Sequence, residues 1–240
     1  MIHSQEVVYG IYQVRAIIWA GYPGQSGGTA IFDIITGKFA PAGRLTTTQY
    51  PAGYVDQVNM TDMSLRPNAV NPGRTYKWYT GKPVVEFGHG LHFTTFQFSW
   101  EKRPLAQYDI QQLVHTAQRE NPLDVATFDT FYINIENTGK VISDYVALLF
   151  LSGDGGPIPR PIKSLISFAR AHGIEPNSSS TVELKVTLGS VARADERGDL
   201  WLFSGSYRIV LDVGEDVLTH DFILTGHSAR ILQWPQNSSV

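Results

Sequence analysis

The sequence contains no cysteine, no long uninterrupted hydrophobic run and no large excess of charge of one sign. Without cysteine there is no disulfide bridge, thiolate metal site or thiol nucleophile. No apolar stretch approaches the roughly 20 residues that cross a bilayer as a helix. The formal net charge is -3 and no long basic run occurs, which argues against nucleic-acid binding. We therefore expect neither a nucleic-acid partner nor a membrane span, and no cofactor.

The chain does have enough residues and enough apolar side chains for a folded core. Its 240 residues, 42% hydrophobic and 17% charged, predict one large domain or two modest ones. The first nine residues lack the cationic and apolar regions of a signal peptide. Three Asn-x-Ser/Thr sequons, at Asn59, Asn177 and Asn237, would accept glycans in a secretory setting. Such tripeptides also arise by chance, so they support secretion only weakly.

The N-terminal part has the pattern of an α/β domain. Residues 14–20 form a short, nearly continuous apolar run, typical of a parallel strand buried on both faces. Glycine-rich residues 21–28 break this run. A helical pattern then begins at about Thr29 and ends at Gly37. Strand, loop and helix together predict half of a βαβ unit.

The next fifty residues are less regular. Residues 43–49 predict a second strand, and residues 74–79 predict a short one. Between them, residues 51–74 are rich in proline, glycine, asparagine and aspartate and have no periodicity. We predict a long surface loop there.

After about residue 84 the pattern becomes that of an all-β protein. In residues 182–188 the apolar side chains alternate strictly with polar ones, which predicts a strand with one buried face. Residues 101–125 are polar and ambiguous, with room for a short helix. The predicted strands are residues 127–136, 145–151, 162–169, 181–188, 206–213 and 218–224. Their number and spacing predict an antiparallel sandwich of immunoglobulin or fibronectin type III character.

The glycine-rich loop is the first candidate for a functional site. Its spacing fits neither a dinucleotide-binding loop nor a phosphate-binding P-loop. Ligands of α/β domains nevertheless bind where such loops follow parallel strands. Tyr22, Gln25 and Ser26 are therefore predicted at a pocket rim. The alternative is that the glycines only allow the helix and strand to pack closely.

Catalytic acids are harder to find. A glycosidase needs two carboxyl groups that flank the scissile bond. Asp33 falls within the predicted helix, Asp56 and Asp62 in the loop, and Glu86 just before a turn. We predict that none of these four is catalytic.

Histidines and tryptophans give no site from the sequence alone. The seven histidines lack metal-ligand spacing, and His89 and His92 are expected at the surface or in a turn. The five tryptophans could stack on sugars, but most tryptophans lie in the core. In the sandwich, Trp201 and Trp234 are too scattered in the sequence to predict an aromatic patch.

Several motifs resemble glycoside hydrolase family 3. Residues 17–38 and 41–51 resemble its second domain, and residues 86–96 resemble the start of its fibronectin type III-like domain. Two further segments fit later strands of that domain, residues 192–196 and 203–207. Within the family, three segments resemble fungal β-xylosidases more than β-glucosidases: residues 62–67, 71–76 and 78–81. The resemblance runs from about residue 14 to the end, with order and spacing intact.

The resemblance implies a domain plan of α/β plus all-β class. Residues 1–83 would be the truncated C-terminal part of the family's (α/β)6 sandwich domain. Residues 84–126 would be a connector, and residues 127–240 a fibronectin type III-like antiparallel β-sandwich. The family's remaining domain is an N-terminal barrel, which would be this chain's missing partner. Residues 1–13 do not resemble the preceding family segment.

The resemblance also implies an activity. The intact enzyme would be extracellular and would release xylose from β-xylosides and xylo-oligosaccharides with retention, through a covalent glycosyl-aspartate. The family's nucleophilic aspartate lies on the barrel and its acid/base glutamate lies upstream of the matched segment. Neither has a counterpart in this chain. We therefore expect the isolated chain to be inactive, with no catalytic residue of its own.

Alternatives remain open at this point. The sandwich could be a non-catalytic carbohydrate-binding or interaction module, or a structural remnant. Xylosidase, arabinofuranosidase and glucosidase specificity are not distinguished. Without neighbouring strands, Ile17, Ile18 and Trp19 would each lose up to about 1.5–3 kcal/mol of burial. Residues 1–80 are therefore expected to be frayed and the sandwich to be the stable part.

Overall fold

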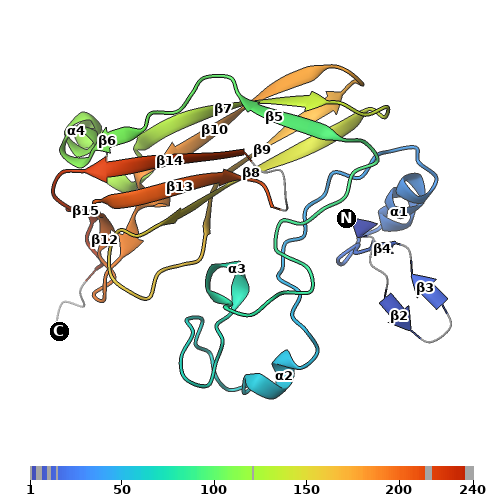
Figure 1. The fold of residues 1–240 in the computed structure, drawn as a ribbon, viewed down its shortest axis with the longest axis horizontal. Helices are drawn as coiled ribbons and strands as arrows, with labels where there is room; N and C mark the ends of the chain where they lie inside the picture. Colours follow the sequence, from blue (N-terminus) through green and yellow to red (C-terminus); the bar gives the residue numbers. More distant parts are fainter. Residues whose placement is uncertain are drawn as a thin grey trace.

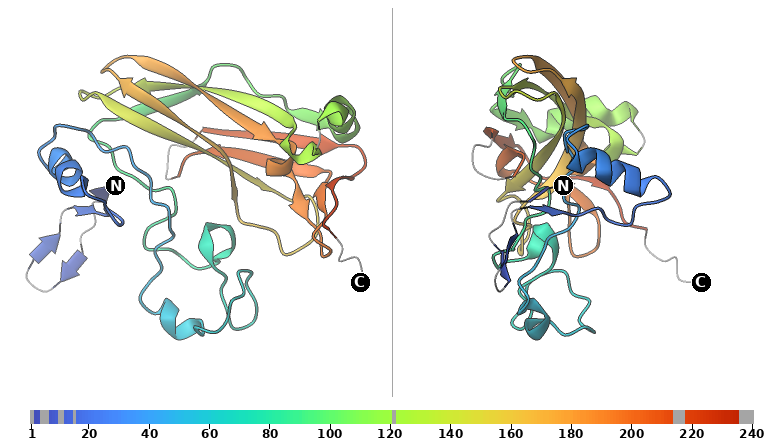
Figure 2. Two further views of the ribbon diagram at one scale, coloured as in Figure 1. Left: turned by 180° about the vertical axis from the view of Figure 1, so that it is seen from behind. Right: turned by 90° about the vertical axis from the view of Figure 1, so that its right-hand side faces the viewer.

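The structure is a computed structural model that describes residues 16–120, 122–213 and 218–235, with the backbone of three short strands before them. A β-sandwich dominates it (Figure 1). Residues 41–93 run beneath the sandwich and carry the short helices α2 (Tyr54–Gln57) and α3 (Thr75–Trp78). The N-terminal helix α1 (Gly27–Ile35) lies beyond one end of the sandwich, as the view from behind in Figure 2 also shows.

Two sheets face each other in the sandwich. The first has the order β10-β7-β5, made of β10 (Ser179–Thr187), β7 (Thr127–Asn137) and β5 (Phe96–Trp100). The second has the order β6-β14-β13-β8-β9, made of β6 (Gln107–Asp109), β14 (Leu218–Thr225), β13 (Gly205–Leu211), β8 (Ser143–Gly153) and β9 (Ser164–Ile174). All neighbours are antiparallel except β6 and β14. The six predicted sandwich strands are therefore confirmed, and β5 and β6 join them.

Smaller elements close the ends of the sandwich. One end carries a three-stranded sheet of order β11-β12-β15, made of β11 (Arg193–Ala194), β12 (Leu200–Leu202) and β15 (Ala229–Leu232). The polar region after residue 100 forms α4 (Ile110–Thr116), as its composition allowed. Single turns of helix follow at Ala117–Arg119, Leu123–Val125 and Leu188–Val191.

The alternating sequence of β10 explains how one sheet finds the other. Val182, Leu184 and Val186 are buried in the core, whereas Glu183 and Lys185 point to solvent. In the register with β7, Val182 lies opposite Ile133 and Leu184 opposite Phe131. Because side chains alternate across a strand, a shift of one residue would expose the whole apolar set.

A tyrosine fixes one corner of the sandwich. Tyr207, near the start of β13, is buried, and its hydroxyl donates a 2.8 Å hydrogen bond to the carbonyl oxygen of Phe203. A tyrosine that bonds back to the chain a few residues upstream is a hallmark of immunoglobulin-like sandwiches. This contact supports the predicted sandwich type with a specific interaction.

Strand β8 is buried on both faces. Ala147, Leu149 and Leu151 face the sandwich core. The intervening Leu148 and Phe150 are equally buried but lie outside that core cluster. Their side of the sheet would face solvent in an isolated sandwich, so another part of the chain must cover it.

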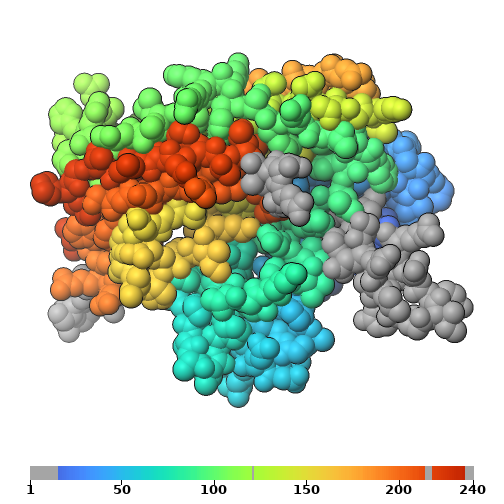
Figure 3. All heavy atoms as spheres, in the orientation of Figure 1, coloured from blue at the N-terminus to red at the C-terminus, as the bar shows by residue number. Residues whose placement is uncertain are grey.

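Residues 41–93 provide that cover (Figure 3). Tyr76 and Phe87 stack on each other and meet the Phe150 ring edge-on, at centroid distances of 5.9 and 6.2 Å. Gly88 has φ of +85°, and a Cβ there would lie 2.8 Å from Leu148 Cδ1. Glycine is needed at this position both for the backbone angle and for the close approach.

Two strands predicted in this covering segment are wrong. Residues 43–49 form no strand, and only an isolated bridge joins Gln49 to Val85. Residues 74–79 contain helix α3 instead of a strand. The helical turn directs Tyr76 to the sandwich and Tyr79 to a cluster with Tyr50 and Tyr54. Contacts distant in sequence thus override the local pattern. The loop predicted at residues 51–74 is confirmed, except that it contains the short helix α2.

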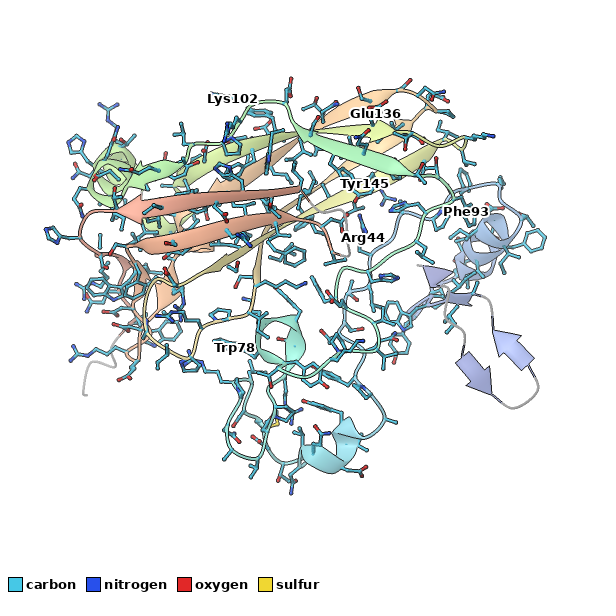
Figure 4. The ribbon with its side chains drawn as sticks, viewed as in Figure 1. Arg44, Trp78, Phe93, Lys102, Glu136 and Tyr145 are labelled. Atoms are coloured by element: carbon cyan, nitrogen blue, oxygen red, sulfur yellow. The ribbon has the colours of Figure 1, made fainter. Side chains whose placement is uncertain are left out.

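A buried ion pair joins the covering segment to the sandwich. Arg44 Nη2 lies 2.5 Å from Asp212 Oδ2, with side-chain exposures of 9% and 6%. The guanidinium also donates to the Val146 carbonyl, from Nε at 3.1 Å and Nη2 at 2.9 Å. Its carbon Cζ lies 4.7 Å from the centre of the Tyr145 ring, and Figure 4 shows these two side chains together. One arginine therefore contacts several groups of the sandwich at once.

The carboxylate of Asp212 is equally well bound. It accepts hydrogen bonds from the Tyr145 hydroxyl and from the Val213 backbone N–H. Its own backbone N–H donates to Leu148 at 2.7 Å, and its φ of 71° is unusual for a residue other than glycine. Burial raises the pKa of Asp212 and lowers the pKa of Arg44, and each charge opposes the shift of the other. Each charge is therefore tolerated in this buried position only while its partner is present.

The N-terminal segment differs most from its prediction. The single strand expected at residues 14–20 is wrong: among residues 16–20 only β4 (Ile17–Ile18) forms, antiparallel to β1 (Ile2–His3). A separate pair joins β2 (Val7–Tyr9) to β3 (Tyr12–Val14). The expected parallel strand needs parallel neighbours on both sides, and the described residues provide none.

Helix α1 is confirmed, beginning two residues before Thr29 and followed by Gly37 at φ of 75°. None of its residues is buried. Phe32, Ile35 and Phe39 are 64, 66 and 60% exposed, and Ile17 and Trp19 are also exposed. A broad apolar surface therefore lies around α1.

Replacing Arg44 tests the buried pair. Arg44→Met leaves the Asp212 carboxylate buried without its cation, so we expect the free energy of unfolding to fall by about 3–5 kcal/mol. Urea denaturation followed by tryptophan fluorescence measures this loss. The matched control is Lys185→Met, which breaks an exposed 3.5 Å pair with Glu183 and should cost less than about 1 kcal/mol.

The double variant Arg44→Met/Asp212→Asn removes both charges. We expect it to be more stable than Arg44→Met alone, because no uncompensated charge remains and asparagine tolerates a positive φ. Equal losses for Arg44→Met and Lys185→Met would contradict the role of the pair.

The packing moves the expected limit of the frayed region from about residue 80 to about residue 40. Limited trypsin digestion should cut after Lys38, whose side chain is 63% exposed, and leave a resistant fragment that begins near residue 39. Mass spectrometry of the fragments locates this boundary. A resistant core that retains α1, or one that begins only after residue 93, would contradict a boundary of stable packing near residue 40.

Candidate functional site

The three predicted rim residues lie in the loop before α1. Tyr22, Gln25 and Ser26 are all exposed, and Ser26 is the N-cap residue of the helix without a side-chain capping bond. They share one loop, as predicted, but they line none of the cavities described below. Their role at a pocket rim stays a prediction.

Two of the three glycosylation candidates are described. Asn59 is exposed, and its Oδ1 accepts hydrogen bonds from the backbone N–H and the hydroxyl of Thr61 in the same sequon. Asn177 is exposed in the turn between β9 and β10, with φ of 57°. Asn237 lies outside the described residues.

The four acids considered from the sequence have structural partners or lie at the surface. Asp33 pairs with Lys38, and Glu86 with Lys163, each at 3.1 Å. Asp62 accepts from the Ser64 backbone N–H and from Asn71, and these bonds lower its pKa. Asp56 is exposed on α2. Of these four acids, only Glu86 lines one of the cavities described below.

Three acids line one of the cavities. At the α4 end of the sandwich, a cavity of about 420 Å³ is lined by Asp109, Glu120 and Asp129 among other residues. Asp109 Oδ1 caps α4 by accepting from the Gln112 N–H at 2.8 Å. Asp129 accepts from the buried Tyr108 hydroxyl at 2.5 Å, and burial, together with this bond, raises the pKa of Tyr108. Two of the three acids are therefore used by the fold, which leaves no free acid and nucleophile pair here.

A second cavity lies at the junction between the covering segment and the sandwich. Its volume is about 250 Å³, and Tyr76, Tyr79, Phe87 and the Glu86–Lys163 pair line it. The Lys163 ammonium also lies 5.0 Å from the centre of the Phe150 ring. The pair bridges the two parts of the chain beside the aromatic contacts of the junction. It holds a single acid, so it can bind polar groups but has no second carboxylate for hydrolysis.

His92 lies at the same junction, in a cavity of about 440 Å³ that it shares with Arg44, Tyr145 and Asp212. The imidazole stacks on Tyr145 at a centroid distance of 5.1 Å and meets Phe96 edge-on. His92, expected at the surface or in a turn, is partly buried between these aromatic rings. Burial lowers its pKa to about 4, the nearby Arg44 charge acts in the same direction, and the Pro41 carbonyl opposes them.

The last cavity is lined by two aromatic side chains. Trp201 and Phe203 lie beside the turn at residues 195–199, in a cavity of about 430 Å³. Trp234 lies against Gly198 of the same turn and donates its backbone N–H to Asp199. Pairing of β12 with β15 brings Trp201 and Trp234 to the same turn, but Trp234 does not line the cavity, so the expectation that these two tryptophans form no common patch stays a prediction.

The residues that the structure describes contain no cluster of three or more histidines and acids that could hold a metal ion. None of the helices they form is long and apolar enough to span a membrane.

Comparison with known proteins places these features in a family. The model of the glycosyl hydrolase family 3 C-terminal domain matches residues 2–93, and that of the fibronectin type III-like domain matches residues 145–214. Over residues 2–93 the chain is thus similar to the C-terminal domain of glycosyl hydrolase family 3. The covering segment and α1 thus fall in the first match, and most of the five-stranded sheet in the second.

Among the proteins similar to this chain are fungal enzymes. A probable exo-1,4-beta-xylosidase of Aspergillus oryzae is 54% identical over 93% of this chain, and one of Aspergillus fumigatus is 53% identical over the same share. This chain covers only 28 and 29% of their respective lengths. The resemblance to fungal β-xylosidases is confirmed.

Solved structures agree with the fold. A GH3 exo-beta-xylosidase in complex with a xylobiose aziridine activity-based probe is 47% identical, with a TM-score of 0.89 over 94% of this chain and 30% of that one. The beta-D-glucoside glucohydrolase of Trichoderma reesei is 24% identical, with a TM-score of 0.67 over 89% of this chain and 31% of that one. The second likeness concerns the fold alone.

The buried imidazole predicts a pH dependence of stability. Unfolded His92 takes up a proton near its ordinary pKa of 6.5, whereas the folded state does so only near 4. The unfolded state therefore binds more protons between these values, and the free energy of unfolding falls as the pH falls from 7 to 4. With allowance for partial exposure, we expect His92 to account for roughly 2 kcal/mol of this fall.

Urea denaturation at pH 7.0 and 4.5 measures this effect. His92→Phe should lose part of the pH dependence, whereas His115→Gln, at an exposed position on α4, should retain it. Identical pH profiles for the wild-type protein and His92→Phe would refute the assignment.

Proposed function

We propose that this chain is the C-terminal section of an extracellular, retaining, exo-acting β-xylosidase that acts on xylo-oligosaccharides. The chain forms a structural part of that enzyme and contributes no catalytic carboxylate. The observation that carries the proposal is the 54% identity to a probable exo-1,4-beta-xylosidase over 93% of this chain. The whole enzyme would release xylose from non-reducing ends.

The acids of the chain support a non-catalytic role. Retaining hydrolysis needs two carboxyl groups about 5 Å apart, one as nucleophile and one as acid and base. Asp109 and Asp129 share a cavity in the described part of the chain, but a helix cap and a tyrosine hydroxyl occupy them. A carboxylate that accepts such hydrogen bonds is a poor nucleophile, because its lone pairs are engaged and its position is fixed.

The exposed apolar surface around α1 supports a larger protein. On full burial each of these side chains would gain up to about 1.5–3 kcal/mol, and the less exposed ones would gain less: Phe32, Ile35, Phe39, Ile17 and Trp19. We infer that the remainder of an (α/β)6 domain covers this surface in the whole enzyme. The missing N-terminal barrel would then be the partner of that domain.

The same proposal assigns the domains and minor sites. Residues 1–83 are the C-terminal part of the (α/β)6 domain, residues 84–126 the connector and residues 127–240 the sandwich. The connector contributes β5 and β6 to the two sheets of the sandwich. Tyr22, Gln25 and Ser26 stand at the rim of the substrate pocket in the whole enzyme. In a secretory pathway, Asn59, Asn177 and Asn237 accept glycans.

A chimera tests the proposal. In the Aspergillus oryzae relative, this chain would replace the matching C-terminal part. We expect the chimera to release xylose from an aryl β-xyloside, because the family's acids lie in the portion that the relative supplies. The isolated 240-residue chain should release none.

Two controls give this experiment its meaning. The relative without its C-terminal part should be inactive, so that any activity of the chimera depends on this chain. Xylose release by the pure isolated chain would contradict the proposal, and so would a soluble, folded chimera without activity.

The alternative function is a non-catalytic carbohydrate-binding module built on the sandwich. One specific observation favours it, the cavity that contains Trp201 and Phe203. The two functions are compatible within one enzyme.

A further inference from the structure

Two aromatic rings at one end of the sandwich point away from its core. Leu202 is fully buried, whereas its neighbours Trp201 and Phe203 are only partly buried and lie outside the core cluster. Because side chains alternate along a strand, a buried Leu202 directs both rings to the opposite side. They therefore line a cavity of about 430 Å³ instead of filling the core.

The two rings form a nearly parallel pair. Their planes differ by 23°, and their centroids are 6.3 Å apart. An aromatic face is electron-rich and apolar, so it attracts the polarised C–H groups on the flat face of a pyranose ring. Two such faces in one cavity suit a ligand with more than one sugar unit.

Asp195 holds the indole in place. The Trp201 Nε1–H donates to Asp195 Oδ2 at 3.0 Å. Asp195 Oδ1 accepts from the backbone N–H groups of Arg197 and Asp199, at 2.8 and 3.0 Å. This carboxylate is fully engaged, so its part is to orient the tryptophan and not to contact a ligand.

The opposite wall is fixed by Arg193. Its guanidinium donates to the carbonyl oxygens of Gly155, Pro157 and Pro159, which holds the loop after β8 in one conformation. Gly156 has φ of +81°, and a Cβ there would lie 2.5 Å from the Phe203 ring. The ring packs directly on this backbone. Preformed walls reduce the entropy that binding must overcome.

Two charged side chains at the cavity remain available. Glu196 and Arg197 are exposed, and in the part of the chain that the structure describes neither side chain makes a hydrogen bond or salt bridge. A carboxylate accepts hydrogen bonds from hydroxyl groups, and a guanidinium donates to them. Their opposite charges cancel, which favours a neutral ligand with many hydroxyl groups over an ion.

We propose that this cavity, between Trp201, Phe203, Glu196 and Arg197, binds a neutral β-linked oligosaccharide. The rings stack on the sugar faces, and the two charged side chains bind hydroxyl groups. The choice of xylo-oligosaccharide as ligand rests on the proposed function, whereas the sugar-binding chemistry rests on the cavity alone. The cavity would hold a xylan chain near the enzyme between cleavage events.

Titration of the intact 240-residue chain with xylohexaose tests the proposal. Isothermal calorimetry and the change in tryptophan fluorescence are the two readouts. We expect saturable binding that Phe203→Ala weakens at least tenfold, and that Glu196→Ala weakens severalfold. The matched control is Trp234→Ala, which removes a 60% exposed tryptophan beside the same turn but outside the cavity and should leave affinity unchanged.

Unfolding curves of each variant ensure that a loss of binding is not a loss of fold. No binding by the folded wild-type chain, or equal effects of Phe203→Ala and Trp234→Ala, would overturn the proposal. Cellohexaose in place of xylohexaose separates the two claims: preference for the glucose chain would overturn the choice of xylose only. Activity of the chimera described above is independent, so its failure would reject the β-xylosidase assignment without touching this site.

Discussion

The contact between Arg44 and Asp212 is the constraint on which the arrangement of the chain depends. It joins residues that are 168 positions apart, at 2.5 Å and almost out of solvent. Asp212 follows β13, and its backbone N–H bonds to Leu148 of β8, so the pair is anchored in the five-stranded sheet. An ion pair of this kind contributes little net energy but is costly to break on one side. It therefore acts mainly by specifying where residues 41–93 sit.

Burial of β8 on both faces follows from that specification. With Arg44 in place, the stacked rings of Tyr76 and Phe87 lie over Phe150, and the sheet gains a second apolar layer. The sandwich is then not an independent module with a wet outer face. This explains why a segment with only two four-residue helices can be well packed: its order comes from the sheet it covers. It also explains why packing ends near residue 40, where contact with the sheet ends.

Periodicity along the sequence predicts the sandwich well and the rest poorly, for a physical reason. The strand predicted at residues 181–188 matches β10 within two residues, because its alternating side chains meet one core and one solvent face. The conformation of residues 43–49 and 74–79 is instead decided by contacts with a sheet that is distant in sequence. Such contacts produce no periodic pattern in the local sequence. The aromatic cavity was also missed. Its signal was the alternation of Trp201, Leu202 and Phe203, which places two rings on one side of a buried leucine.

The distribution of acids in the chain separates binding from cleavage. Asp195, Asp109 and Asp129 all lie at cavities, yet each is committed to a tryptophan, a helix end or a tyrosine. Such acids make cavities rigid, and they leave Glu120 at the α4 cavity and Glu196 at the aromatic cavity without a second free carboxylate. Rigid walls, aromatic faces and spare polar groups are what a sugar-binding surface needs, and none of these requires a reactive carboxylate. A chain of this composition can therefore serve a hydrolase by holding its substrate, while bond cleavage depends on acids supplied from elsewhere in the enzyme.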